Sequence, residues 1–244
     1  MRFKPFGIAM LASLLAVAML AASASAQGVS DATKTLDDAL KSKNADAVSS
    51  GISALISAYI DAEKEADKTA AVNSLAKTLK FYGGDGKCII EAAQGLSGMG
   101  APAAKPLASA LKDKKLRKEP KLKEAYLACI RALGATKSVR DSKTLINLLK
   151  DKDFYVVAAA ADALGNYNDV KLNYRRSIAE QMVNALDSAY NAAQADPRNT
   201  TFQKRYEIIG VPLMTALSKV TGASPGGAPE WRKWFNDNKK KRWN

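Results

Sequence analysis

Apolar residues recur along this chain at the spacing of amphipathic helices. Between Val48 and Ile60 they follow an i, i+4, i+7, i+8 pattern, which places them on one face of a helix. Similar stripes follow at 72–79 and through much of 87–190. No segment alternates apolar and polar residues for long enough to indicate a strand. The pattern therefore predicts an all-α protein.

Capping residues and prolines mark the ends of the expected helices. Ser30 and Asp67 are expected to cap the first and third helices, because their side chains can accept the free N–H groups of a first turn, and the second helix is expected to begin near Asn44. Pro106 and Pro229 fit the first turn of a helix, where the missing N–H of proline costs little. These residues predict where five of the helices begin.

Three consecutive helical pairs share a motif. In each pair the first apolar run ends in a turn that contains Leu and Gly, and the second run ends on Leu-Lys-Asp or Leu-Asp. The first runs end at Leu96, Leu133 and Leu164, in steps of 37 and 31 residues. Self-similarity at this period is typical of a helical solenoid, in which each pair buries its apolar face against its neighbours.

At 92–96, 104–107 and 159–165 the chain resembles the HEAT-like repeat family, whose units pair two antiparallel helices. The resemblance extends over 87–190 and is weaker over 30–81. It implies an α-solenoid of HEAT-like helical pairs. Many bacterial repeats of this kind carry a Val-Arg pair early in the first helix, which is absent here, so the charged contact of that Arg is not implied.

The C-terminal part departs from the repeat. A long helix is expected at 200–220, followed by a break and a short helix that carries Trp231 and Trp234. The i, i+3 spacing of the two tryptophans lets both face one side of that helix. Two interpretations remain open: a capping helix that closes the end of the solenoid, or an aromatic ligand surface. The ending is similar to that of exported HEAT-repeat proteins of environmental bacteria, which implies a fold and a compartment but no chemistry.

The N-terminus has the features of a secretory signal peptide. A basic start precedes an apolar core and the small residues Ala24-Ser25-Ala26. That core is shorter than the ~20 apolar residues that a membrane span needs. We therefore expect an exported protein, periplasmic or extracellular after cleavage near Ala26, with no transmembrane span in the mature chain. The expected organisation is a signal peptide (1–26), N-terminal helices with a degenerate repeat (27–86), HEAT-like repeats (87–198), and a C-terminal helix with a Trp-containing cap and basic tail (199–244).

The chemistry available to the chain is limited. It contains no histidine, the residue that most often serves as a general acid or base and as a metal ligand. Cys88 and Cys129 are its two cysteines. Aligning the repeats offsets them by one helical turn on helices packed ~8–10 Å apart, beyond the ~7 Å Cα separation that a disulfide tolerates. We expect two buried free thiols, no cofactor, no metal site and no enzymatic activity.

Charge is distributed unevenly along the chain. The formal net charge is +13, and residues 71–244 hold 30 basic and 16 acidic residues. A basic body of this kind favours acidic partners. The densest basic stretch is the long linker 113–120, which together with basic residues of the repeats could form one patch. The candidate partner-binding residues are Lys114, Lys115, Arg117, Lys118, Arg131, Arg140, Arg175, Arg176, Trp231 and Trp234.

Two functions follow from these features. The first is an exported, non-enzymatic scaffold that mediates protein–protein interaction through its helical repeat surface. The alternative is a binder of polyanions or of an anionic envelope surface, which would use the basic body and tail. Nucleic acid is disfavoured as a partner because export separates the protein from it and the sequence carries no base-reading motif.

Overall fold

The computed structural model describes residues 28–243, so the expected signal peptide at 1–26 lies outside the described residues. The described residues form helices and no strands, which confirms the predicted all-α class. The α-helices are α1 (Val29–Ser42), α2 (Ala45–Asp61), α3 (Glu65–Lys77), α4 (Lys87–Ser97), α5 (Ala104–Ala110), α6 (Lys114–Lys118), α7 (Lys123–Ala135), α8 (Ser142–Leu148), α9 (Phe154–Leu164), α10 (Leu172–Ala195), α11 (Thr200–Thr221) and α12 (Ala228–Asn238). Short 3₁₀ turns are η1 (Thr78–Lys80), η2 (Gly84–Gly86), η3 (Ala101–Ala103), η4 (Pro120–Leu122) and η5 (Tyr167–Asp169).

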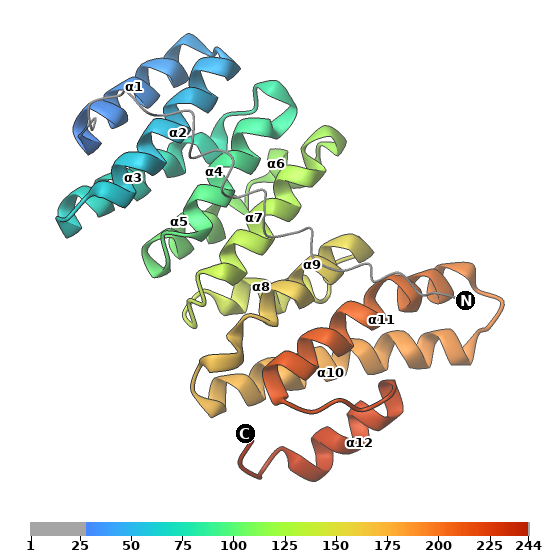
Figure 1. The fold of residues 1–244 in the computed structure, drawn as a ribbon. Helices are drawn as coiled ribbons and strands as arrows, with labels where there is room; N and C mark the ends of the chain where they lie inside the picture. Colours follow the sequence, from blue (N-terminus) through green and yellow to red (C-terminus); the bar gives the residue numbers. More distant parts are fainter. Residues whose placement is uncertain (1–27, 244) are drawn as a thin grey trace, which may run out of the picture.

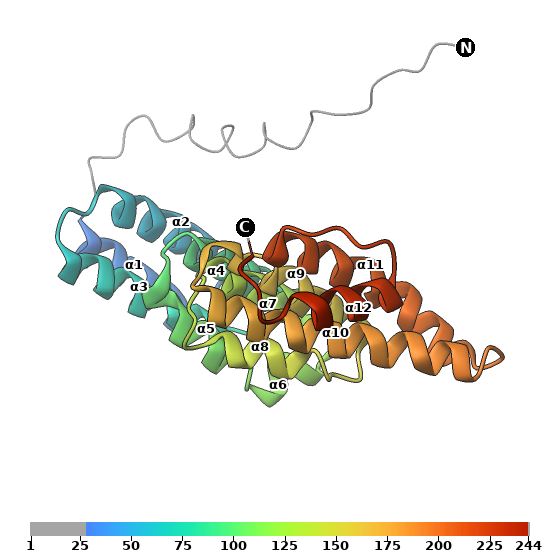
Figure 2. The ribbon, with the colours of Figure 1, turned by 90° about the horizontal axis from the view of Figure 1, so that it is seen from below.

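The helices lie in two rows that run side by side along an elongated molecule (Figures 1 and 2). The first row follows α2, α4, α7, α9 and α11, and each of these helices packs against the next. The second row follows α3, α5, α8 and α10. Helix α1 packs on α2 and α3 at one end, and α12 packs on α10 at the other. Of the three predicted pairs, α7 packs on α8, whereas α4–α5 and α9–α10 are not among the main helix contacts and α10 packs most extensively on α11.

Three of the five predicted helix starts are confirmed. Asn44 caps α2, since its Oδ1 accepts the backbone N–H groups of Asp46 and Ala47, both at 3.0 Å. Pro106 lies in the first turn of α5, and Pro229 in the first turn of α12. At these positions the local chemistry of the sequence is enough to determine where the helix begins.

The predicted caps Ser30 and Asp67 are wrong. Helix α1 begins one residue before Ser30, and the carbonyl of Gly28 already accepts the first N–H groups of that helix. Helix α3 begins at Glu65, so Asp67 lies inside its first turn. A carboxylate there still stabilises the helix through the macrodipole without acting as the cap.

Two glycines of the Leu-Gly motif allow neighbouring helices to pack closely. Gly134 lies inside α7, and a Cβ there would be 2.5 Å from the Cβ and 2.6 Å from the Cα of Ala163 on α9. Gly165 follows α9 with a helical φ of −60°, and a Cβ would be 3.3 Å from the Cα of Ala216 on α11. The expected turn is wrong at Gly134, which is helical, and is confirmed at Gly165, which directly follows the end of α9. At both positions the absent side chain lets neighbouring helices of the first row approach closely.

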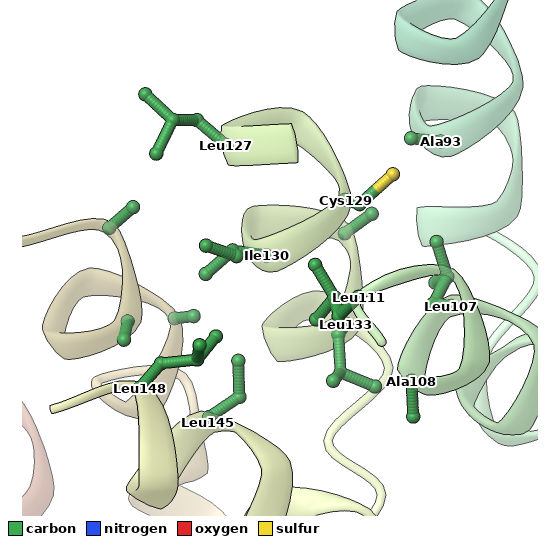
Figure 3. Close-up of a cluster of buried hydrophobic side chains, with 14 of the residues drawn as sticks. Ala93, Leu107, Ala108, Leu111, Leu127, Cys129, Ile130, Leu133, Leu145 and Leu148 are labelled. Atoms are coloured by element: carbon green, nitrogen blue, oxygen red, sulfur yellow. The ribbon is translucent and has the colours of Figure 1, made fainter. Parts of the chain in front are cut away.

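The core runs between the two rows. Leu96, Leu133 and Leu164, which mark the repeat, are fully buried. Figure 3 shows the Cys129 side chain on α7 pointing toward Ala93 on α4. Cys88 and Cys129 are both buried and free, as predicted, so they pack as small apolar side chains.

Candidate binding surfaces

The long basic linker between α5 and α7 is a folded segment. The Asp113 Oδ1 accepts the backbone N–H groups of Lys115 at 2.8 Å and Leu116 at 3.0 Å, which caps the short helix α6. Leu116 is fully buried, and α6 packs on α7. The sequence predicts a charged linker here, whereas in the structure the central Leu116 anchors this segment to the core.

Several cations of this joint are paired with carboxylates of the neighbouring joints. Arg117 on α6 contacts a carboxylate just before α9, and Lys123 at the start of α7 contacts another in the same segment. Each pair joins two segments that connect successive helices, so these side chains link neighbouring parts of the fold. The pairs are Arg117 Nη2–Asp151 Oδ2 at 2.7 Å, Lys123 Nζ–Asp153 Oδ2 at 2.8 Å and Lys121 Nζ–Asp85 Oδ1 at 3.7 Å.

Lys115 also contacts a group within the chain. Its Nζ lies 4.5 Å from the centroid of the Tyr82 ring, a cation–π contact. Burial raises the pKa of Tyr82 to about 12, and a hydrogen bond to the Asp113 carboxylate adds to this. The backbone N–H of Leu116 lowers the pKa of Asp113, so that carboxylate stays charged. Lys115 is therefore held over a ring that itself is fixed to the cap of α6.

The other two candidates of the joint remain open to solvent. Lys114 and Lys118 are exposed, and neither forms an ion pair with a residue of the described range. Of the four candidate basic residues in this segment, Arg117 and Lys115 contact groups of the chain itself. Lys114 and Lys118 remain available to a partner.

Arg131 lies in a groove between α4 and α7. The groove encloses about 330 Å³, and its lining includes Glu124 as well as Arg131 and the apolar Ile90. Arg131 also lies near Asp162 on α9, a carboxyl whose pKa is raised mainly by burial. This surface of the first row therefore carries both signs of charge in close proximity.

Arg140 lies apart from the basic joint. It is an exposed residue between α7 and α8, whereas α6 precedes α7. A helix of 13 residues is ~20 Å long at 1.5 Å per residue, so the length of α7 separates the two positions. The predicted basic residues thus occupy several distinct places and do not form one patch.

Arg175 and Arg176 hold the C-terminal end in place. The Arg175 Nε donates to the backbone carbonyl of Val220 at 2.7 Å, and an Nη of Arg176 donates to the carbonyl of Lys241. Both guanidinium carbons lie 6.0 Å from the ring centroid of Trp243. These two arginines contact the chain's own C-terminal segment.

The tryptophans form an aromatic cluster at the end of the molecule. Trp231 is fully buried, and its ring lies 5.8 Å from that of the half-buried Trp234 in a T-shaped arrangement. Trp243 lies 5.5 Å from Trp234 and is 7% exposed. The cluster belongs to the segment that packs alongside α10, and Trp231 offers no surface to a partner. Sequence reasoning placed Trp243 in a basic tail and did not anticipate its burial.

The second row contains two grooves. One lies between α3 and α5, encloses about 550 Å³ and is lined by Lys77, Lys80 and Lys112 over the apolar Leu79 and Pro106. Lys77 is paired with the Asp37 carboxylate at 2.8 Å. Lys80 and Lys112 are exposed and form no ion pair within the described residues. The Asp113 carboxylate also lines this groove, and the charge of Lys80 is among the causes that lower its pKa, so the positive charge here is partly compensated.

The other groove lies between α8 and α10. It encloses about 280 Å³, and its lining contains two cations, three neutral polar side chains and an apolar floor. Sequence reasoning missed it, although the polar side chains on α10 stand at i, i+3 and i+7 and so share a helix face. The lining residues are Lys150, Arg205, Gln181, Asn184, Ser188, Ile146, Leu149 and Ala185.

Within residues 28–243 no three His, Cys, Asp or Glu side chains are grouped as a metal site would require. None of the helices there combines the length and apolar character needed to cross a bilayer. A scan of the chain against protein-family models finds no match, and a search of curated proteins also finds none. The function is therefore argued from the surfaces themselves.

Proposed function

We propose that this protein is an exported, non-enzymatic α-solenoid of HEAT-like pairs that binds another protein on the second row, formed by α3, α5, α8 and α10. The solenoid interpretation is supported by the packing of each first-row helix on the next. Export rests on the signal-peptide features of residues 1–26. The lack of histidine in the chain favours a binding role over acid–base catalysis.

The observation that carries the proposal is the α8–α10 groove of the second row, whose lining holds two cations and an apolar floor but no carboxylate. Both grooves between second-row helices combine lysine or arginine with an apolar floor. The groove between α4 and α7 pairs Glu124 with Arg131 and is balanced in charge. Apolar contact area with a few polar groups at its edge is the usual composition of a protein-binding surface.

Site-specific photocrosslinking in the native envelope fraction tests this function. A photoreactive residue is placed at Ser109 in the α3–α5 groove, at Ser188 in the α8–α10 groove, or at Thr215 on the first-row helix α11 as the control. We expect one saturable protein adduct from the first two positions and none from the third.

Other patterns of labelling contradict the proposal. Equal labelling from all three positions would indicate non-specific contact. Absence of any protein adduct, combined with salt-sensitive retention on heparin, would favour the polyanion alternative. Export is tested separately by mass spectrometry of the mature N-terminus, which we expect at Gln27.

A further inference from the structure

We infer that the groove between α8 and α10 binds an extended segment of the partner in which acidic and apolar residues alternate. The inference rests on the proposed function and deepens it, because it names the site and the chemistry of the segment. Lys150 and Arg205 pair with its carboxylates, and the polar side chains of α10 bond its backbone.

The charges of the groove favour an anionic segment. No acidic residue is among those that line it, while Lys150 and Arg205 contribute two positive charges. Neither cation forms an ion pair with a described carboxylate. Arg205 is positioned by its contact with the Phe154 ring, whose centroid lies 5.5 Å from the guanidinium carbon. A guanidinium stacked on an aromatic face keeps its N–H edge free for a carboxylate.

Asp187, one of the two carboxylates of α10, is already paired with a cation. Asp187 on α10 accepts from Arg232 of α12 at 3.1 Å. The same Arg232 nitrogen also donates to the Asn184 Oδ1 at 2.9 Å. That bond fixes the Asn184 amide, so its NH₂ group is the part left for a ligand.

The polar side chains of α10 have the spacing to follow an extended backbone. Gln181, Asn184 and Ser188 span seven helical steps, or ~10 Å at 1.5 Å per residue. An extended chain covers that length in about three residues at ~3.3 Å each. Amide and hydroxyl groups can donate to carbonyls and accept from N–H groups, so three of them suit the alternating groups of a peptide.

The apolar floor of the groove favours a peptide over a purely charged ligand. Ile146, Leu149 and Ala185 offer apolar contact between the two cations. Successive side chains of an extended peptide point to opposite sides, so an apolar residue can face this floor while its neighbours reach the cations at the rim. A polysaccharide or polyphosphate has no side chain for that floor.

Binding of a defined probe tests the inference. The probe is an end-blocked, fluorescein-labelled hexapeptide of alternating glutamate and leucine, titrated into the purified protein and followed by fluorescence anisotropy. The variant K150Q/R205Q is expected to weaken binding about tenfold, since two charge-assisted contacts are lost. The matched control K114Q/K118Q removes the same net charge from exposed positions of α6 and is expected to leave the affinity within twofold.

A second pair of variants separates backbone recognition from general attraction. Q181A/S188A is expected to weaken the hexapeptide about threefold while retention on heparin stays unchanged. Arg205→Lys keeps the positive charge and so tests whether the charge alone supports binding. The melting temperature of each variant shows whether lost binding reflects lost folding. Lys150→Gln alone, at an exposed position, gives a further variant that does not disturb the Phe154 contact.

The outcomes distinguish this inference from the proposed function. Equal weakening by K114Q/K118Q and K150Q/R205Q, or no effect of Q181A/S188A, overturns the groove as the site and indicates diffuse attraction of a polyanion. If the probe does not bind while the crosslinks at 109 and 188 persist, the acidic segment is wrong and the scaffold function stands. If those crosslinks are absent and the probe still binds in the groove, the proposed function fails by itself.

Discussion

Arg117 and Asp151 join two successive connections of the repeat. The Arg117 Nη2 lies 2.7 Å from the Asp151 Oδ2, and the Asp151 side chain is 9% exposed. The other oxygen of that carboxylate accepts the backbone N–H of Asp153 at 2.9 Å. The pair thus links α6 to the start of α9 through a carboxylate that is almost removed from solvent.

Removal of Arg117 is expected to destabilise the fold. Arg117→Gln leaves the Asp151 carboxylate largely buried without its cation, which should cost about 1 kcal/mol, because the exposed half of the pair is screened by water. Urea unfolding of the variant measures this loss. Lys118→Gln on the same short helix is the control and should change the free energy of unfolding by less than ~0.5 kcal/mol. Equal loss in both variants would show that the pair has no special role.

Gly134→Ala is expected to disturb the contact between α7 and α9. A methyl group there would meet the backbone of Ala163 at 2.6 Å, and backbone cannot move aside as a flexible side chain can. We expect a loss of about 2–3 kcal/mol in the free energy of unfolding. Gly98→Ala is the matched control, since its Cβ would meet nothing closer than 3.7 Å and its φ is −81°. Thermal unfolding that ranks the two variants in the opposite order contradicts the packing role.

Trp243→Ala is expected to loosen the C-terminal cap. The indole lies 5.5 Å from Trp234 and 6.3 Å from Phe235, and its Nε1 donates to the carbonyl of Asn238 at 2.9 Å. Loss of this buried ring should cost about 3 kcal/mol, as large-to-small changes at buried aromatic sites do. Arg242→Ala, which changes the exposed neighbour, should be close to neutral. If denaturant unfolding gives both variants the same free energy of unfolding as the parent, the tail does not contribute to stability.

The buried thiols make the fold sensitive to alkaline pH. Burial raises the pKa of Cys129 from an ordinary 9.0 to about 12. Above pH 9 the unfolded chain loses this proton while the folded chain keeps it, so stability falls as pH rises from about 9 to 12. The slope for one thiol reaches about 1.4 kcal/mol per pH unit.

Unfolding at pH 8 and pH 10 isolates that contribution. The free energy of unfolding should fall between pH 8 and pH 10 in both proteins, and this fall should be smaller in Cys129→Ala than in the parent by about 1 kcal/mol. The other groups that titrate in this range are common to both proteins and cancel in the comparison. An unchanged difference would show that Cys129 reaches solvent as a thiolate in the folded state.

Much of the fold could be predicted because its signals are local. Asn44 and Pro106 act through their own first turns, and the apolar period that ends at Leu133 depends on one helix face. The role of Gly134 could not be predicted in the same way. Its closest neighbour, Ala163, belongs to a different helix, and only the assembled row brings the two together.

The candidate surfaces were harder to predict, because charge density says nothing about partners. Arg117 and Lys115 belong to the densest basic stretch, yet each is held by a group from a neighbouring connection. Arg175 turns toward Trp243, which lies near the far end of the sequence. The α8–α10 groove combines Lys150 with a residue from α11, so its cations are not near each other in sequence.

The close contacts at Gly134 and Gly165 both lie at the carboxyl ends of their helices, one after the other along the first row. A Cβ at Gly134 would lie 2.6 Å from the Cα of Ala163, and one at Gly165 would lie 3.3 Å from the Cα of Ala216, so a side chain at either position would press on the next helix. The close spacing of α7, α9 and α11 therefore depends on two positions that carry no side chain.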